Sequence, residues 1–316
     1  MNARPLTAVV TPVYNGDSFL RETIESVQAQ TYPNLVHVLL DNASTDRTAE
    51  IIAANQGRKV PIVTARNAEL LPLCQNWNAA MRLAPTEAKY LRLLCADDTM
   101  SPTCIERMVE VAETDPEILV VGVGVTRITD LAFSWPTNRT SLDGAELIRG
   151  FFRRTLGFYA VHTMIRRSVL EWRPEVFDCT YWTGIDFEAV LGILRRGKFG
   201  MVHEHLGWVR VHEESETSQV MLTKNTHYVD WLRALYRHGP HVFSQREFRQ
   251  IAKRYERRYL RLILRWQQIQ GKAAVQHHWD ALKQERGRVT PLDFIDSAID
   301  WALIRVGARP RWFGWP

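Results

Sequence analysis

Two adjacent carboxylates stand where a run of apolar residues ends. Asp97 and Asp98 follow the segment 90–94, whose sequence YLRLL is typical of a buried strand. One carboxylate at such a position can cap the following turn. Two together favour ligand binding, because hard divalent cations such as Mg²⁺ and Mn²⁺ take oxygen ligands and are often shared with substrate phosphates. We therefore predict a metal or ribose site at Asp97 and Asp98, with a turn cap as the alternative.

Two further polar segments follow apolar runs. The segment Asp41-Asn-Ala-Ser-Thr-Asp46 comes after residues 36–40, and Pro12-Val-Tyr-Asn-Gly16 comes after the first run of the chain. A carboxylate at the position of Asp41 can accept hydrogen bonds from a base or ribose, or it can form an Asx turn into the next helix. Asp46 falls in the first turn of that helix, where a negative charge suits the helix dipole, so we interpret it as structural.

Several function classes are disfavoured by missing motifs. Neither GxGxxG nor GxxxxGK[ST] occurs, which argues against a dinucleotide-binding dehydrogenase and a P-loop enzyme. The four cysteines, at 74, 95, 104 and 179, form no CxxC pair, so we expect neither a zinc site nor a redox motif, and we expect reduced thiols of a cytoplasmic protein. No apolar run reaches the length of about 18 residues that a transmembrane helix needs.

The elements that position these loops alternate between strand and helix in the first part of the chain. Strands are expected at 8–11, 36–40, 60–63, 90–94 and 118–125. Helices are expected between them at 17–30, 45–55, 73–83 and 101–113. This alternation predicts a mostly parallel sheet with helices on both faces. Such sheets bind ligands at the carboxyl ends of their strands, so the three polar segments should converge on one edge.

The rest of the chain is less regular and ends in helices. We expect helices at 143–154 and 186–196, and strands at 162–165, 199–202 and 206–211. From residue 223 onward the pattern is helical, with apolar residues at spacings of three or four between Phe248 and Trp266. Residues 241–316 hold 15 Lys/Arg against 7 Asp/Glu, while the whole chain carries +5. This basic segment is interpreted as a solvated helical face, with an anionic partner as the alternative.

Four motifs in order carry a family resemblance. They are VTPVYNG at 10–16, SVQAQTYPN at 26–34, DNASTD at 41–46 and ADD at 96–98. Together they resemble the successive motifs of family 2 glycosyltransferases, and the match extends over roughly residues 6–215. The resemblance implies an α/β structure of the GT-A type. It also implies an inverting enzyme that moves a sugar from a nucleotide-diphosphate sugar, with a UDP-sugar favoured, to a saccharide or lipid-linked acceptor in bacterial surface polysaccharide or glycan synthesis.

The resemblance also assigns roles in the first half. Asp97 would contact the ribose, and Asp98 would bind the Mn²⁺ or Mg²⁺ that bridges the diphosphate. The other nucleotide-binding residues would be Pro12, Val13, Tyr14, Asn15, Asp41, Asn42 and Asn78. One residue departs from the pattern: many relatives carry an acidic residue where this chain has Cys95. This departure supports one rival hypothesis, a non-catalytic scaffold that keeps the fold and binds a nucleotide-sugar.

In the second half, the segment GIDFE at 184–188 resembles the acceptor side of the family, and Asp186 occupies the position of the general base. Such a base must take the proton of the attacking acceptor hydroxyl. Glu188 is a weaker candidate. His212 could bind metal or diphosphate and Arg210 could hold phosphate, while a structural role stays open for each.

The predicted organisation is a catalytic domain at 1–222 followed by a helical extension. Residues 1–125 would form the nucleotide-sugar half, and 126–222 the acceptor half. The Trp-rich and Arg-rich extension at 223–316 would suit packing, a homodimer contact, or a peripheral contact with the inner face of a membrane. No nucleic-acid-binding module is recognisable, so no nucleic-acid partner is expected. A nucleotidyltransferase is disfavoured because residues 12–16 contain no Lys or Arg.

Overall fold

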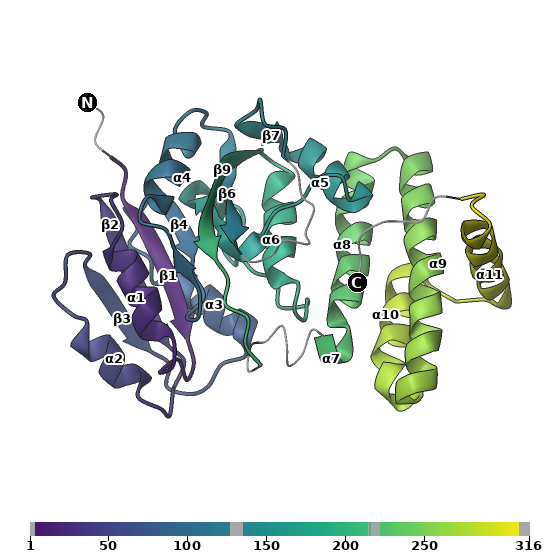
Figure 1. Cartoon of the computed structure of the whole chain (residues 1–316), viewed down its shortest axis with the longest axis horizontal. Coiled ribbons are helices and arrows are strands. Elements are labelled where there is room, and N and C mark those ends of the chain that lie inside the picture. The colour runs from purple at the N-terminus through teal and green to yellow at the C-terminus, as the bar shows by residue number, and fades with distance from the viewer. Residues whose placement is uncertain (1–3, 127–134, 214, 216–221, 310–316) are drawn as a thin grey trace. The chain divides into compact units, whose positions relative to one another are not determined.

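The computed structural model describes residues 4–126, 135–213, 215 and 222–309 (Figure 1). Clustering of contacts divides the chain into two compact units. The first contains 1–147, 157–180 and 185–211, and the second contains 148–156, 181–184 and 212–316. Two short segments from earlier in the chain thus belong to the same unit as the C-terminal helices. Among the described helices, none is both long and apolar enough to cross a bilayer.

The first unit is built on one mixed sheet with the strand order β3-β2-β1-β4-β8-β6-β9-β5, and β7 pairs with β9. Its strands are β1 (Thr7–Val13), β2 (Leu35–Asp41), β3 (Ile62–Arg66), β4 (Tyr90–Leu93), β5 (Thr99–Met100), β6 (Ile118–Thr126), β7 (Ser141–Asp143), β8 (Thr163–Arg166) and β9 (Lys198–Trp208). The predicted α/β architecture is therefore confirmed. The first four strands are parallel, as expected, whereas β8 runs antiparallel between β4 and β6.

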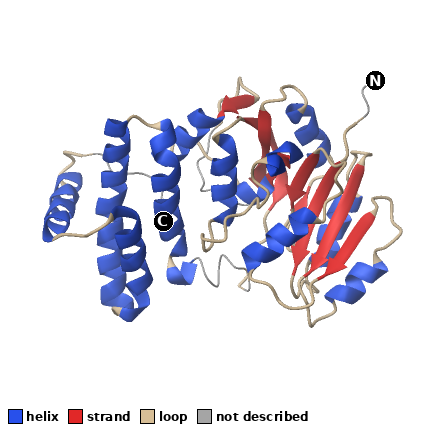
Figure 2. Ribbon diagram, turned by 180° about the vertical axis from the view of Figure 1, so that it is seen from behind, coloured by secondary structure: helices blue, strands red, loops and turns tan. Residues whose placement is uncertain are grey.

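Helices cover both faces of this sheet. They are α1 (Leu20–Gln28), α2 (Thr48–Ala54), α3 (Leu73–Arg82), α4 (Cys104–Ala112) and α6 (Ile185–Leu194). The helix α5 (Gly144–Arg153) begins in the first unit and ends in the second. The helix α1 lies on the face seen in Figure 1, and α3 lies on the face seen in Figure 2. All seven side chains of β1 and of β2 are buried, which explains their continuous apolar character in the sequence. Because β1, β2 and β4 are parallel, their carboxyl ends reach the same edge.

Two expectations about elements differ from the structure. The segments 199–202 and 206–211 were expected as separate strands, but a single strand, β9, covers most of this region and pairs with β6 through three register shifts. Such irregularities interrupt the period-two pattern and make one long strand look like two. The helix expected to begin at Thr45 begins at Thr48, because the preceding residues are engaged in a loop.

The prediction that all the cysteines are reduced is wrong for one pair. Cys74 of α3 and Cys179 form a disulfide, while Cys95 and Cys104 are free thiols. The paired cysteines are 105 residues apart in the sequence. A local motif cannot reveal such a pair, because only the fold of the first unit brings α3 next to the segment that precedes α6.

The second unit consists mainly of helices. After α7 (Leu222–Lys224) these are α8 (Thr226–Val242), α9 (Gln245–Gln270), α10 (Gln276–Arg286) and α11 (Pro291–Arg305). An aromatic core holds it together: the Trp231 ring stacks on Tyr255 at 4.5 Å between centroids and meets Phe152 edge-on at 5.2 Å. Phe152 belongs to the segment 148–156, so this segment contributes directly to the helical core.

Candidate active site

The loops after β1 and β2 brace one another at the carboxyl edge of the sheet. The backbone N–H of Asn15 donates to Oγ of Ser44 at 3.0 Å, and the backbone N–H of Thr45 donates to Oδ1 of Asn15 at 2.9 Å. The N–H of Gly16 donates to Oγ1 of Thr48 at 2.8 Å. Asn15 has a φ of 48°, a left-handed conformation that Asn tolerates better than most residues. These bonds fix the relative position of two segments that the sequence predicted to share the site.

Asp46 takes part in the same bracing. Its Oδ2 accepts from the N–H of Asp17 at 2.9 Å, and its Oδ1 accepts from the N–H of Thr48 at 3.0 Å. Burial raises the pKa of Asp46, but the hydrogen bonds from the Thr48 side chain and from backbone N–H groups outweigh this effect and lower it overall. Asp46 therefore has a structural role, as expected, but it acts in the loop before α2 and not in the first turn of that helix.

The predicted nucleotide loop after β1 has a buried part and an exposed part. Pro12 and Val13 are buried as the last residues of β1, whereas Tyr14 is 48% exposed. A Cβ on Gly16 would lie 2.5 Å from Cγ2 of Val13, so only glycine allows this turn to close. The exposed side chains that this loop offers to a ligand are those of Tyr14 and Asn15.

Asp41 and Asn42 lie at the end of β2 with their side-chain atoms already engaged. Oδ1 of Asp41 accepts from the N–H of Ser44 at 2.9 Å, and its other oxygen pairs with Arg66 at the end of β3. The Asn42 amide donates to the carbonyl of Leu71 at 2.9 Å and accepts from the N–H of the same residue at 3.0 Å. Both side chains thus shape the edge of the site, and their contact with a nucleotide stays a prediction.

Asn78 is buried and clamps the segment that leads toward α6. Its amide nitrogen donates to the Phe177 carbonyl at 2.8 Å, and its oxygen accepts from the Phe177 N–H at 2.9 Å. The Cys74–Cys179 disulfide ties the same helix, α3, to the same segment. Asn78 therefore has a structural role in this chain, and the predicted proximity to the nucleotide stays untested.

The loop that carries Asp97 and Asp98 is fixed from both sides. The hydroxyl of Thr23, buried in α1, lies 2.8 Å from the carbonyl of Ala96 and 2.9 Å from that of Asp98. On the other side, the N–H of Arg210 donates to Oδ1 of Asp98 at 3.0 Å, and Nε of Arg210 donates to the carbonyl of Asp97 at 3.1 Å. Asp98 is only 4% exposed, so its carboxylate is held in one orientation.

Two buried residues extend this support behind Asp98. Nη2 of Arg92 lies 3.0 Å from Nδ1 of His162, and Nε2 of His162 lies 3.3 Å from Oδ2 of Asp98, at the long end for a hydrogen bond. Because a guanidinium can only donate, Nδ1 must accept and Nε2 must carry the proton. Burial lowers the pKa of His162, and Arg92 lowers it further although Asp98 opposes this shift. His162 is therefore neutral, and its Nε2–H faces Asp98 without completing a hydrogen bond of normal geometry.

A group of potential metal ligands lies at this loop. Among the described residues, Cys95, Asp97 and Asp98 each offer one ligand atom, and these atoms lie within 4.8 Å of one another. Burial, and then the charges of Asp98, Asp97 and Asp186, raise the pKa of the Cys95 thiol well above its usual value. A neutral thiol is a poor ligand, whereas paired carboxylate oxygens suit a hard cation. The ligand atoms of this group therefore suit Mn²⁺ or Mg²⁺ bound by the carboxylates.

Asp186 lies in the first turn of α6 and belongs to the same electrostatic group. Its charge contributes to the raised pKa of Cys95. Tyr159 has a pKa raised first by burial and then by Asp98, Asp186 and the other acidic groups of the site. Glu188 is different, because it is 1% exposed and its carboxylate lies 2.5 Å from Nη2 of Arg173. Of the two acids in α6, Asp186 is the one associated with the metal-ligand group.

Residues 8–172 match the model of one protein family, described as glycosyl transferase family 2. This chain belongs to that family. An uncharacterized glycosyltransferase of Rickettsia typhi is 26% identical to it over 224 residues, which cover 69% of this chain and 67% of the relative. The protein is therefore a transferase enzyme of family 2, as the four sequence motifs predicted.

Solved structures support the GT-A fold of this glycosyltransferase. S. aureus TarS 1–349 in complex with UDP-GlcNAc has a TM-score of 0.67 at 14% identity, covering 88% of this chain and 80% of TarS. The mannosyltransferase PcManGT from Pyrobaculum calidifontis, in complex with GDP-Man and Mn²⁺, has a TM-score of 0.59 at 16% identity, covering 98% and 83%. At such identities the likeness concerns the fold alone.

Two weaker predictions for the glycosyltransferase concern the end of β9. The Arg210 guanidinium pairs with Glu22 and lies 4.6 Å from the centroid of the Phe19 ring. This residue therefore supports the Asp97–Asp98 loop, and phosphate binding stays a prediction. His212 is half-buried and follows the last residue of the first unit. Its role as a metal ligand is likewise untested.

Sequence reasoning missed His162 and Tyr159 as members of the site. His162 was expected only as the first residue of a strand at 162–165, and it lies 64 positions after Asp98 in the chain. Its one local signal is a polar side chain just before the apolar strand β8, which any surface histidine would share. Only the antiparallel pairing of β8 with β4 brings it behind Asp98.

Proposed function

We propose that this glycosyltransferase moves a sugar from a nucleoside diphosphate to a hydroxyl of a saccharide or lipid-linked acceptor, with inversion and with a divalent metal ion. The observation that carries the proposal is the group formed by Cys95, Asp97 and Asp98, whose potential ligand atoms lie within 4.8 Å of one another. The carboxylates of this group would hold the metal ion of the leaving diphosphate, and Asp186, in the first turn of α6, would serve as the base for the acceptor.

The donor side of the proposed reaction depends on Asp97 and Asp98. When bound, Mn²⁺ or Mg²⁺ would stabilise the charge that grows on the departing diphosphate. Asp98 would hold the ion, since the Arg210 N–H and His162 orient its carboxylate. Asp97, which is less buried, would contact the ribose. The exposed Tyr14 and Asn15 would border the base.

The acceptor side depends on Asp186. An acceptor hydroxyl that attacks the anomeric carbon must lose its proton during the attack, and Asp186 would accept that proton at its carboxylate. Attack on the face opposite the diphosphate inverts the configuration of the anomeric carbon.

The relatives support the donor class but leave the nucleotide open. TarS is bound to UDP-GlcNAc and PcManGT to GDP-Man with Mn²⁺ in their structures, so a diphosphate donor is common to both while the base differs. For this chain we propose a UDP-sugar and an acceptor from bacterial surface polysaccharide or glycan synthesis. We also assign to the helical unit either a homodimer contact or a peripheral membrane contact.

Thermal shift against UDP, GDP, TDP and CMP, each with and without Mn²⁺, tests this proposal. We expect a metal-dependent rise in the unfolding temperature with one diphosphate, because a ligand that binds only the folded state stabilises it. The Asp98→Asn variant should lose the metal-dependent part of the rise. If no nucleotide shifts the wild type, the non-catalytic scaffold becomes the better account, and the replacement of an acidic residue by Cys95 becomes its explanation.

A further inference from the structure

One side of α11, the last described helix, carries a row of exposed apolar side chains. Each of its four large members is between 53% and 75% exposed. Spacings of three, four and seven residues place them on one face of the helix. The row, which we call the apolar stripe, consists of Leu292, Ile295, Ala298, Ile299, Ala302 and Val306. A continuous row of this kind, unlike scattered apolar residues, indicates a contact surface.

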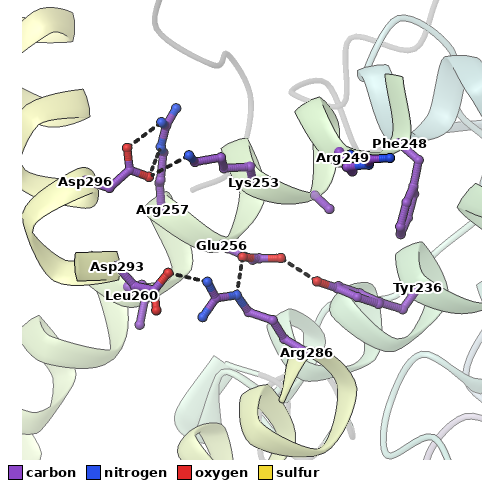
Figure 3. Close-up of a pocket in the computed structure, with 11 residues that line it drawn as sticks. Tyr236, Phe248, Arg249, Lys253, Glu256, Arg257, Leu260, Arg286, Asp293 and Asp296 are labelled. Carbon is purple, nitrogen blue, oxygen red and sulfur yellow. Dashed lines mark hydrogen bonds and ion pairs between the residues drawn. The ribbon is translucent and has the colours of Figure 1, made fainter. Parts of the chain in front are cut away.

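The acidic side chains of α11 lie on the side that faces neighbouring helices. All three are ion-paired to arginines of α9 or α10: Asp293 to Arg286, Asp296 to Arg257 and Asp300 to Arg261. Figure 3 shows the first two pairs, in which the Arg257 guanidinium lies 2.6 Å from the Asp296 carboxylate. A surface helix normally buries its apolar side and exposes its charges. These ion pairs fix the opposite orientation, so the apolar stripe of α11 remains exposed.

The residues beside and after the stripe suit a boundary between lipid and water. Arg305 is exposed, and its guanidinium lies 5.3 Å from the centroid of the Trp301 ring. In the sequence, residues 305–316 include Trp312 and Trp315 and contain no Asp or Glu. Tryptophan is enriched at membrane–water interfaces, and the absence of acidic residues from this segment removes a source of repulsion by anionic lipids.

A second copy of the chain and a lipid bilayer are the two partners that an apolar stripe on a helix could meet. A specific protein–protein contact uses about 20–30 residues on each side. The stripe offers far less, since it has four large side chains and two alanines. A bilayer needs no complementary shape, because an amphipathic helix lies in the interface with its apolar face among the acyl chains. The stripe therefore fits a bilayer better than a second copy.

We propose that the apolar stripe of α11 docks on the surface of a lipid bilayer. This inference selects the membrane contact from the two contacts assigned above to the helical unit, and it names the residues that make it. A bilayer is also where a lipid-linked acceptor would lie, and to that extent the inference rests on the proposed function. The stripe belongs to the second unit and Asp98 to the first, so the two proposals can be tested separately.

Sedimentation of the full chain with vesicles of phosphatidylglycerol and phosphatidylcholine tests the proposal. The variant Ile295→Ser/Ile299→Ser removes two exposed side chains of the stripe, and its matched control, Val63→Ser/Ile269→Ser, removes two exposed side chains elsewhere. We expect the stripe variant to bind the vesicles at least about tenfold more weakly than the wild type and the control less than about twofold, because apolar area enters the bilayer only at the stripe. No binding by the wild type, or equal binding by the stripe variant and the control, would overturn the proposal.

A second variant guards against an effect on folding. Leu292→Ser/Val306→Ser changes the two most exposed residues of the stripe, so it should unfold at the temperature of the wild type and still weaken vesicle binding at least about tenfold. Wild-type binding by this folded variant would contradict the role of the stripe.

Two further measurements separate the membrane contact from a dimer and from the transfer reaction. Light scattering without vesicles should give the same molar mass for the wild type and the stripe variant. A dimer that dissociates in the stripe variant would assign the stripe to a second copy and overturn the proposal. Asp98→Asn should bind vesicles as the wild type does, so loss of nucleotide binding and loss of membrane binding are distinguishable.

Discussion

Asp98 is the residue whose surroundings say most about the site, because its carboxylate accepts from the N–H of Arg210 and lies 3.3 Å from a buried imidazole. His162 and Arg92 are both fully buried, and the imidazole presents its only N–H to Asp98. Burying a guanidinium and an imidazole is expensive unless they are paired. Buried groups placed behind a carboxylate in this way are how proteins usually orient a metal ligand, which is the role that we propose for Asp98.

We predict that His162→Gln weakens metal binding more than nucleotide binding. Loss of a residue that supports a metal ligand typically costs 10- to 100-fold in metal affinity or activity, so the Mn²⁺ concentration needed for half-maximal nucleotide binding should rise by about tenfold or more. Affinity for the nucleotide at saturating Mn²⁺ should change by less than about twofold. His203→Gln on the exposed side of β9 is the control. A metal dependence like that of the wild type in His162→Gln would contradict this role.

The substitution Gly207→Ala tests the position of His162 independently. A Cβ on Gly207 of β9 would lie 2.4 Å from Nδ1 of His162, so the imidazole would have to move. We expect the metal dependence to change in the same direction as in His162→Gln. If the two variants change it in opposite directions, His162 does not act through its position behind Asp98.

At the scale of the elements, the strands and the loops that carry the site were predictable from the sequence. The apolar runs that became β1, β2 and β4 are continuous because both faces of these strands are covered, and each is followed by polar residues. What the sequence could not reveal depends on contacts between distant segments. The antiparallel insertion of β8, the pairing of Cys74 with Cys179 and the place of His162 all arise from such contacts, which have no local pattern.

The disulfide between α3 and the segment before α6 gives a prediction about stability. Closing a loop of this length restricts the unfolded chain, and the stabilisation is of the order of 2–5 kcal/mol. We expect Cys74→Ser to lower the free energy of unfolding, measured with urea, by that amount, and Cys95→Ser to lower it less. Thiol titration of the unfolded, non-reduced chain should count two free thiols, Cys95 and Cys104. Four free thiols would show that the disulfide does not form in the purified protein.

At the scale of the whole molecule, both units contain a buried neutral histidine. His37 of β2 and His278 of α10 each have a pKa lowered to about 3, chiefly by burial. In His278, Nε2 donates to the Lys224 carbonyl at 3.1 Å, and Nδ1 accepts from the Tyr259 hydroxyl at 2.7 Å. Nδ1 of His37 has no hydrogen-bond partner in the described structure, so a proton there would be costly.

These histidines predict a loss of stability in mild acid. Their pKa is about 6.5 in the unfolded chain and about 3 in the folded one, so between these values the unfolded chain binds protons that the folded chain does not. The stability is fully present above about pH 6.5 and falls as the pH drops, by about 2 kcal/mol per histidine at pH 5. Urea unfolding at pH 7.5, 6 and 5 measures this, and His37→Gln should reduce the slope. A flat profile would contradict the burial of neutral histidines.

The two compact units do not coincide with the two domains that the sequence predicted. The boundary predicted at residue 222 stays a prediction, since segments 148–156 and 181–184 group with the C-terminal helices. In the sequence, this region was expected only as part of a helix at 143–154. Nothing local indicates that its aromatic residues pack in the helical unit.

If Asp98 binds the metal of the donor site and Asp186 serves the acceptor, substitutions of the two residues should affect nucleotide binding differently. Calorimetric titration of the nucleotide selected by thermal shift, with and without Mn²⁺, measures this directly in the wild type, in Asp98→Asn and in Asp186→Asn. We predict that Asp98→Asn loses the increase in affinity that Mn²⁺ produces, whereas Asp186→Asn keeps it and loses only sugar transfer, by roughly 10²–10⁴-fold. An unchanged Mn²⁺ effect in Asp98→Asn would contradict the account.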